Sequence, residues 1–486
     1  MNVCMYVVEF LCIWQNKMGK HSLKAASLSF SKSGIAAQPL LCNEKNYERN
    51  EEQHSLSTKS NRHQIHRRAR RLVRIFLISL GISSLCFFLY VYIPILSAIH
   101  SRSMSISGWG YNTSKDTANY VYPNRDTTLI NPSNVCSNNF FLLIVVTSSI
   151  TNFAERLTIR ETWGNVTEFN YPMFSEMHSN NAGGYLNVKE MVVRMHADHL
   201  NLPNVTNISN FTELINNTTI PVKVVFLIGR GGPNNFVGNE TISRLKVESE
   251  QYGDLIQEDF VDTYNNLTLK SVMMLKWIQQ KCLKKMKFVL KCDDDTFVNV
   301  PNLLHFLLGG TIPVYKDTLK MFDSKTVNAL APSNRMIKSR DLLIGYMFCD
   351  AKPISDITNK WYTPMYMYAG EKYPNYLSGS GYLMSTDVVG KLYDASLNVS
   401  IFHLEDVYVT GICAEKAKVK RRHNPLFIFH HSHVSCSYKG IITRHYLNTD
   451  ELREYYNFVA NTTIKCPKLE KYFRLNRLQV RLKNCN

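Results

Sequence analysis

The sequence is short of acidic residues and shows no internal repeat. Lys and Arg number 56 against 39 Asp and Glu, so the 486 residues carry a formal net charge of +17. The first 74 residues hold thirteen Lys and Arg and five Glu, which accounts for +8 and leaves +9 for the other 412. A nucleic-acid-binding protein is therefore disfavoured, because its basic surface would lie on the folded part. The missing repeat excludes a repeat array, and an 11% aromatic content excludes a mostly disordered chain.

Charged residues are absent from positions 75–99, a run of 25 residues that is long enough to cross a hydrocarbon core of about 30 Å. The segment RHQIHRRARRLVR directly precedes this run and favours a cytosolic start. Its alternative interpretation is a nuclear-localisation patch. We expect a basic cytosolic tail over 1–74, a transmembrane signal-anchor over 75–99 and one or two domains beyond it. The start MNVCMYVVEFLCIW lacks a basic region and contains Glu9, so it makes a poor signal peptide, and Met18 is an alternative start.

No Asn-X-Ser/Thr sequon precedes the apolar run, whereas eleven follow it. Eight of the twelve cysteines also follow it, an even number that suits a compartment where disulfides form. Both distributions predict that the C-terminal part lies outside the cytosol. The cysteine pairing cannot be deduced from the sequence.

Short apolar runs predict buried strands at 140–147, 222–228, 287–292, 342–348 and 426–431. The segment NNLTLKSVMMLKWIQQKCLKK between two of them has helical periodicity. Alternating strands and helices indicate an α/β fold with a mostly parallel sheet. We therefore expect a polar stem over 100–135, one α/β domain over 136–486 and an Asn-rich surface insertion near 170–220.

The acidic triplet in KCDDDTFVNV follows the strand predicted at 287–292. Ligands of such sheets collect beyond the carboxyl ends of the strands. Apolar residues on both sides limit solvation of Asp293, Asp294 and Asp295, and carboxylates held together repel one another unless a cation joins them. The oxygen ligands predict Mg²⁺ or Mn²⁺, which in turn could bind a diphosphate. The alternative for an isolated triplet is a solvated turn or helix start.

The triplet resembles the DxD motif of nucleotide-sugar transferases, and its surroundings resemble the β-1,3-galactosyltransferase family, glycosyltransferase family 31. Six blocks carry the resemblance in order: RLTIRETWG, VVFLIGRG, EQYGDLIQEDFVDTYNNLTLKS, KFVLKCDDDTFVN, YPNYLSGSGYLMS and EDVYVTGICAEK. The resemblance implies a GT-A type nucleotide-sugar transferase domain behind a single transmembrane helix. It also implies a Golgi membrane protein of type II topology that transfers a sugar from a UDP-sugar to a glycan acceptor, with inversion and a β-1,3 linkage, in protein or lipid glycosylation.

The resemblance also implies roles for single residues. Asp295 matches the family's metal ligand and Asp293 the residue facing the ribose, with Asp294 in the same donor-binding group. His445 would complete the site for Mn²⁺ or Mg²⁺, or it is a surface histidine at a helix start. Asp406 matches the catalytic base. Its alternative is an acidic pair with Glu405 at a helix N-terminus.

Further residues are assigned to donor binding. Arg156 and Arg160 lie one helical turn apart and suit a phosphate, although structural pairing with acids is the alternative. Asp262 and Lys270 belong to a matching block. Gly379 and Gly381 would let the backbone approach the donor sugar, or form a tight turn.

One departure from the family pattern is Leu377, which stands where many members have Cys, so one disulfide of the family is absent or rearranged. Galactose leads as the donor sugar, with N-acetylglucosamine and N-acetylgalactosamine as alternatives. Two other classes stay open: a non-catalytic lumenal binding protein on the same fold, and an adhesion protein whose acidic triplet binds calcium. No nucleic-acid partner is expected.

Overall fold

The computed structural model describes residues 67–93, 105–132, 134–165, 168–170, 219–231, 238–307, 312, 315, 339–429, 435–461 and 463–467. They belong to two units, Met1–Ile95 and Leu96–Asn486, which we describe separately.

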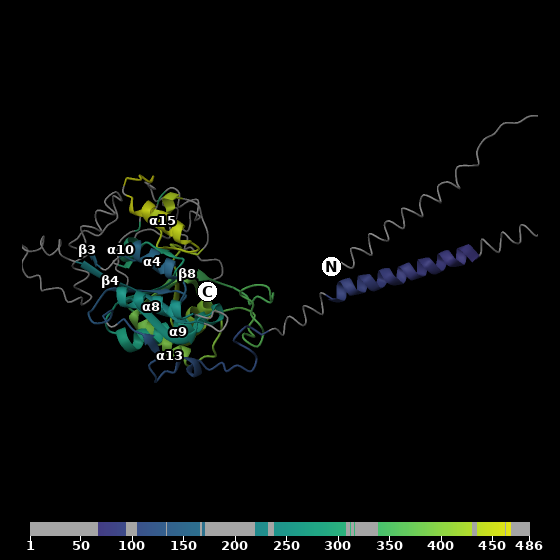
Figure 1. Ribbon diagram of the computed structural model, residues 1–486, viewed down its shortest axis with the longest axis horizontal. Coiled ribbons are helices and arrows are strands. Elements are labelled where there is room, and N and C mark those ends of the chain that lie inside the picture. The colour runs from purple at the N-terminus through teal and green to yellow at the C-terminus, as the bar shows by residue number, and fades with distance from the viewer. Residues whose placement is uncertain are drawn as a thin grey trace, which may run out of the picture. The chain divides into compact units, whose positions relative to one another are not determined.

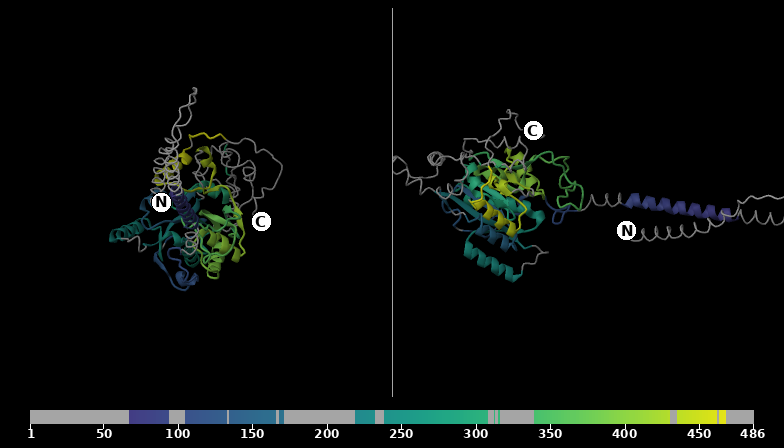
Figure 2. Two further views of the ribbon diagram at one scale, coloured as in Figure 1. Left: turned by 90° about the vertical axis from the view of Figure 1, so that its right-hand side faces the viewer. Right: turned by 90° about the horizontal axis from the view of Figure 1, so that it is seen from above.

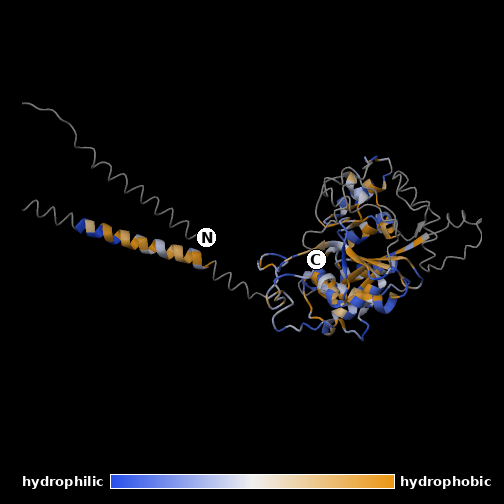
Figure 3. Cartoon of the chain, turned by 180° about the vertical axis from the view of Figure 1, so that it is seen from behind, coloured by the Kyte–Doolittle hydropathy of each residue, from blue (hydrophilic) through white to orange (hydrophobic). Residues whose placement is uncertain are grey.

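The first unit contains a helix, Arg67–Ile93, of 27 residues. In the described part of the chain it is the one helix that is long and apolar enough to cross a membrane. Figure 3 shows its hydrophilic basic start and the hydrophobic residues that follow. The helix begins eight residues before the predicted span, within the basic segment, and residues 94–99 lie outside the described ranges.

A nine-stranded mixed sheet with the order β1-β5-β4-β2-β6-β9-β8-β10 forms the centre of the second unit, and β3 pairs with β4 outside this path. Six strands run in one direction, while β1, β3 and β9 run in the other. The strands are β1 (Thr128–Ile130), β2 (Leu142–Thr147), β3 (Glu168–Asn170), β4 (Thr219–Arg230), β5 (Leu255–Val261), β6 (Phe288–Asp293), β8 (Leu343–Phe348), β9 (Tyr376–Ser385) and β10 (Arg421–His423).

Both faces of the sheet are buried, which explains why the central strands read as continuous apolar runs. In β2, Leu143 and Val145 face one core, and Leu142, Ile144 and Val146 face the other. The first core includes α9 (Leu267–Trp277) and α13 (Thr386–Ser396). The second includes α4 (Phe153–Glu161), α8 (Asn239–Tyr252), α10 (Val300–Leu307) and α15 (Thr449–Ala460). Figure 1 shows α13 and α15 on opposite sides of the domain, and α15 (yellow) lies over the sheet when viewed from above (Figure 2).

A second, three-stranded sheet has the order β11-β12-β7. Its strands are β11 (Phe427–Ile428), β12 (Thr443–Arg444) and β7 (Phe297–Val298). The capping box of Asn448 and Glu451 begins α15 shortly after β12. Shorter elements are α3 (Ala118–Val121), η3 (Tyr264–Asn266), the π-helix η4 (Ile278–Cys282), the π-helix η5 (Val407–Cys413), α14 (Ala414–Lys416) and the 3-10 helix η6 (Ser435–Gly440).

The mixed α/β class is confirmed, and each predicted strand contains a strand, although β11 is short and residues 430–431 lie outside the described ranges. The sequence analysis missed β9, whose three small residues Ser378, Gly379 and Ser380 hide its apolar pattern. The insertion predicted near 170–220 lies mostly outside the described residues.

The predicted stem boundary does not agree with the structure. Residues within 105–132 belong to the folded domain, because β1 pairs with β5 and Trp109 is buried in the first core. The indole of Trp109 donates to the carbonyl oxygen of Asn265 at 2.8 Å, and the ammonium of Lys276 donates to the carbonyl oxygen of Arg125 at 2.6 Å. Contacts with distant segments hold this polar segment against the domain, so its own composition does not reveal them.

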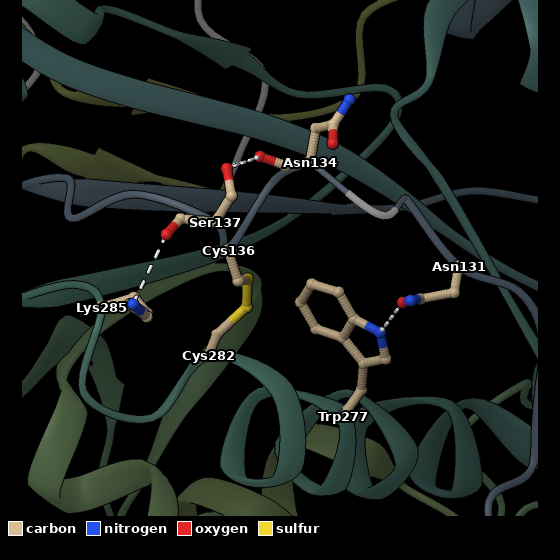
Figure 4. Close-up of a disulfide and its surroundings, with 7 residues drawn as sticks. All are labelled: Asn131, Asn134, Cys136, Ser137, Trp277, Cys282 and Lys285. Atoms are coloured by element: carbon tan, nitrogen blue, oxygen red, sulfur yellow. Dashed lines mark hydrogen bonds between the residues drawn. A yellow bond between two sulfur atoms is a disulfide. The ribbon is translucent and has the colours of Figure 1, made fainter.

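Two disulfides join described residues, Cys136–Cys282 and Cys436–Cys466. Figure 4 shows the first one beside Trp277, whose indole donates to the side chain of Asn131. Cys292 and Cys413 are buried free thiols. Leu377 is buried in β9.

Candidate active site

The predicted acidic triplet lies where β6 ends and the chain turns toward β7. Phe288, Leu290 and Cys292 of β6 face the second core, so the alternate residues Lys291 and Asp293 face the other side of the sheet. Strand β12 pairs antiparallel with β7, with Arg444 opposite Phe297. His445 directly follows β12, so this pairing places His445 next to the turn before β7.

Asp293, Asp295 and His445 form a group whose ligand atoms all lie within 4.8 Å of one another. In the described part of the chain it is the one such group of three. The Nε2 atom of His445 lies 3.0 Å from Oδ1 of Asp295 and 3.7 Å from Oδ2 of Asp293. The group includes Asp293, which the sequence resemblance assigned to the ribose.

The group fits a divalent cation. The Oδ1 atom of Asp295 is buried, and its 3.0 Å contact with Nε2 of His445 lacks the geometry of a hydrogen bond, so this oxygen is available as a ligand. The turn is fixed by the backbone, because the Leu447 amide donates to the carbonyl oxygen of Asp295 at 3.0 Å. The two carboxylates suit a hard cation such as Mn²⁺ or Mg²⁺.

Lys291 connects the acidic turn to β9. Its ammonium lies 2.6 Å from Oδ1 of Asp293, donates to the carbonyl oxygen of Gly379 at 2.6 Å and lies 3.9 Å from Glu405. Burial favours a neutral amine, but Asp293 and Glu405 raise the pKa of Lys291. Burial likewise opposes the charge of Asp293, while Lys291 and His445 lower its pKa. The two residues therefore form an ion pair that keeps Asp293 ionised.

Asp294 faces α4. Its Oδ2 accepts hydrogen bonds from the Ser148 hydroxyl at 2.7 Å and from the Asn152 amide at 2.9 Å. Burial raises its pKa despite these bonds. The Asp294 carboxylate, which was assigned to donor binding, is thus held by the protein's own side chains.

Arg156 and Arg160 make ion pairs within the protein. Arg156 is fully buried, and its Nε and Nη2 donate to the two oxygens of Glu248 at 2.8 and 2.7 Å. Arg160 donates to Glu248 and, through two nitrogens, to Asp254. The structure favours the pairing alternative for both residues. Arg156 also donates to the Ser148 hydroxyl, and so acts on Asp294 through it.

Asp262 and Lys270 form a buried ion pair at 2.8 Å. Lys270 also donates to the carbonyl oxygen of Ser148 at 2.7 Å, and the Gly229 amide donates to Asp262 at 3.1 Å. The pair thus fixes the ends of β2 and β4 beside the acidic turn. The Lys270 ammonium therefore has two partners within the protein, the Asp262 carboxylate and the Ser148 carbonyl oxygen.

Asp406 lies at the start of η5, where its carboxylate accepts the Val407 amide at 2.8 Å. The predicted helix-start position is therefore observed. Burial, followed by the charge of Glu405, raises the pKa of Asp406 to about 7. Glu405 itself accepts the Tyr382 hydroxyl at 2.7 Å. A carboxyl group with a pKa near neutral pH suits a general base.

Gly379 and Gly381 lie within β9 rather than in a tight turn. A Cβ atom on Gly379 would lie 3.1 Å from Oε2 of Glu405 and 3.4 Å from Cβ of Asp406. The missing side chain at this position therefore lets the acidic pair approach the sheet. Through the Gly379 carbonyl and Lys291, Asp406 is connected to the turn that carries Asp293.

Sequence reasoning missed Lys291 and Thr147. Thr147 ends β2 opposite Asp293 in the parallel register, and its hydroxyl donates to Oδ1 of Asp293 at 2.7 Å. A signal was available for Lys291, because a lysine within an apolar strand two residues before an aspartate shares that aspartate's face. No local signal marks Thr147, since its role depends on strand order.

Comparisons with known proteins concern the part of the chain that carries this candidate site. A family model described as Galactosyltransferase matches residues 211–327 and 317–425. Beta-1,3-galactosyltransferase 1 of Mus musculus and that of Homo sapiens are each 30% identical over 343 residues, 70% of this chain and 81% of the relative. Beta-1,3-galactosyltransferase 2 of Mus musculus is 35% identical over 217 residues, 44% of this chain and 45% of the relative. The family ranges contain Asp293, Asp295 and Asp406, whereas His445 lies beyond them.

Proposed function

Since this chain belongs to the β-1,3-galactosyltransferase family, glycosyltransferase family 31, we propose that it moves galactose from UDP-galactose to a glycan acceptor in a β-1,3 linkage. The transfer inverts the configuration at the sugar carbon and takes place on a GT-A type domain. It serves protein or lipid glycosylation.

One observation carries this proposal: a cation-binding group and a carboxyl with a pKa near neutral lie on two segments joined through one lysine. Asp293, Asp295 and His445 provide the first, and Asp406 the second. Lys291 contacts Asp293 and the Gly379 carbonyl, and a Cβ on Gly379 would lie against Asp406. A single displacement needs a stabilised leaving group and a base in one site, so this arrangement supports it.

Asp293, Asp295 and His445 would hold Mn²⁺ or Mg²⁺. Such a cation, when bound, neutralises the charge that develops on the departing UDP. Thr147 and Lys291 hold Asp293 in its ionised form, and the Leu447 amide fixes the Asp295 backbone. The protein thus supplies an oriented ligand set before the donor arrives.

Asp406 accepts the proton of the acceptor hydroxyl as the oxygen bonds to the anomeric carbon and the bond from that carbon to UDP breaks. At a pKa of about 7 the carboxylate is available at neutral pH and basic enough to take the proton. The Val407 amide fixes the orientation of the carboxylate. Gly379 and Gly381 would let the backbone of β9 approach the donor sugar.

We also propose that the chain is a single-pass type II protein of the Golgi membrane with its C-terminal domain in the lumen. The basic start of the helix Arg67–Ile93 supports a cytosolic N-terminus. Two disulfides in the C-terminal unit support an oxidising compartment. Of the described sequon asparagines, Asn112, Asn165, Asn239, Asn398 and Asn461 are exposed.

A donor screen with the detergent-solubilised full chain tests the function. Each UDP-sugar is offered with Mn²⁺ and a panel of acceptor glycans, and both UDP release and product linkage are followed. We expect UDP-galactose to be consumed and a β-1,3 product to form, with EDTA abolishing the reaction. Consumption of UDP-N-acetylglucosamine or UDP-N-acetylgalactosamine alone would mean that the transferred sugar is that one and not galactose. UDP binding without turnover of any donor would favour a non-catalytic binding protein.

A further inference from the structure

Three aromatic side chains from distant segments of the chain lie beside the site, and each is nearly half exposed. Tyr264 in η3 is 47% exposed, Trp361 43% and Tyr446 46%. Tyr264 and Trp361 are neighbours, since the Trp361 side chain is among the groups that act on the pKa of Tyr264. The Lys360 ammonium lies 4.7 Å from the centre of the Trp361 ring and 5.8 Å from that of Tyr446. We call Tyr264, Trp361 and Tyr446 the aromatic wall.

The aromatic wall borders both ends of the proposed site. Burial of its hydroxyl, followed by the charge of Asp406, raises the pKa of Tyr264 to about 12, and Asp293 contributes further. Tyr264 is therefore close to the base and to the acidic turn at once. At the other end, the rings of Tyr446 and His445 are 4.0 Å apart.

The backbone holds Tyr446 in place against its conformational preference. Its φ is +62°, in the left-handed region that a residue with a bulky side chain rarely adopts. The next residue, Leu447, is fixed by its hydrogen bond to Asp295 and is buried in the second core. Such strain persists where surrounding contacts enforce it, and it concentrates at ligand sites. A ring kept in this conformation and still exposed indicates a binding role for Tyr446.

We propose that the aromatic wall binds the acceptor glycan by stacking against the apolar face of its terminal pyranose ring. This inference rests on the proposed function, because it places the sugar whose hydroxyl Asp406 deprotonates. A pyranose combines a face of C–H groups with a rim of hydroxyls, which suits Tyr and Trp rings that are apolar in the middle and polar at one end. The acceptor glycan also has to extend into solvent, and exposed aromatic rings at the edge of the site can contact it there.

Kinetics of Trp361→Ala separate the acceptor from the donor. We expect the KM for the acceptor glycan to rise about tenfold, as for a lost stacking contact of ordinary strength, while the KM for UDP-galactose stays unchanged. Tyr252→Ala is the matched control, since Tyr252 is a 39% exposed aromatic at the end of α8. A rise in the donor KM instead would assign the ring to the nucleotide and overturn the proposal, and so would unchanged values of both.

A fluorescence measurement tests the aromatic wall without catalysis. Trp109, Trp163 and Trp277 are each 2% exposed, so among the described tryptophans only Trp361 is open to iodide. In a Trp14→Phe background, methyl β-galactoside or methyl β-N-acetylglucosaminide should protect the full chain from iodide quenching, and the acyclic polyol glucitol should not. Tyr264→Ala should weaken the protection, while Tyr252→Ala should not.

The two experiments keep the inference and the proposed function apart. If the wild type transfers no sugar but the glycosides protect Trp361, the proposed function fails and the aromatic wall stands. If the wild type transfers galactose and neither glycoside protects Trp361, the aromatic wall fails and the proposed function stands. Protection by UDP with Mn²⁺ in place of the glycosides would also overturn the inference.

Discussion

Replacing Asp406 by Asn should remove activity and raise stability together. The amide keeps the shape of the side chain, and its oxygen can still accept the Val407 amide, which the carboxylate accepts at 2.8 Å. A general base contributes about 10²-fold to 10⁴-fold to a rate. We therefore expect kcat/KM for transfer to fall by about that factor, with UDP affinity largely retained.

The stability gain follows from the pKa of Asp406. A pKa raised from 3.8 to about 7 means that ionising this group costs more in the folded protein than in the unfolded chain. The difference is on the order of 4 kcal/mol as an upper limit. The wild type loses this stability as the pH rises from about 4 to about 7, because the folded state holds the proton more tightly. Because Asn has no charge to bury, the stability of the variant relative to the wild type rises over that pH range and is constant above it.

Two assays on the same protein preparation check this reasoning. Thermal unfolding without divalent cations should give a higher Tm for Asp406→Asn than for the wild type at pH 8, and nearly equal values at pH 4. Transfer of galactose with Mn²⁺ gives the activity. A variant that loses both activity and stability at pH 8 would refute the assignment and make Asp406 a structural residue.

Two further predictions concern neighbouring charges. Glu405→Gln should move the acidic limb of the kcat/KM profile to lower pH by roughly one unit or less, since the charge of Glu405 raises the pKa of Asp406; an unmoved limb would contradict that coupling. Arg156→Met should lower the free energy of unfolding by up to about 3 kcal/mol, because the buried Glu248 keeps only Arg160 as a partner, with the KM for UDP-galactose unchanged. A raised donor KM at unchanged Tm would restore the phosphate-binding role of Arg156.

Local sequence patterns predicted the part of the site that lies at strand ends. The apolar run before Asp293 indicated the end of β6, whereas the roles of Asp295 and Asp406 were assigned from the resemblance to the family. The pairing of Arg156 with Glu248 joins residues 92 positions apart, and no local periodicity encodes it. Such pairings depend on which helices cover the same face of the sheet.

The antiparallel β9 shows a second limit of sequence reasoning. Small residues in its middle resemble a turn, yet they are needed because Glu405 and Asp406 approach the strand there. In the same part of β9, the carbonyl oxygen of Gly379 accepts a hydrogen bond from the Lys291 ammonium. The feature that hid the strand from the sequence analysis is therefore the feature that brings the base to the acidic turn.

The acidic turn implies a last prediction, which concerns the dependence of UDP binding on a divalent cation. Asp293 and Asp295 would repel a diphosphate, so UDP affinity should depend on a divalent cation. Asp295→Asn should therefore weaken UDP binding severalfold or more with Mn²⁺ and strengthen it, or leave it unchanged, in EDTA, because the variant loses a ligand in one case and a repulsive charge in the other. Calorimetry of UDP binding under both conditions measures this reversal, with Tyr252→Ala as the control. Equal weakening in both conditions would mean that Asp295 shapes the turn rather than holding a cation.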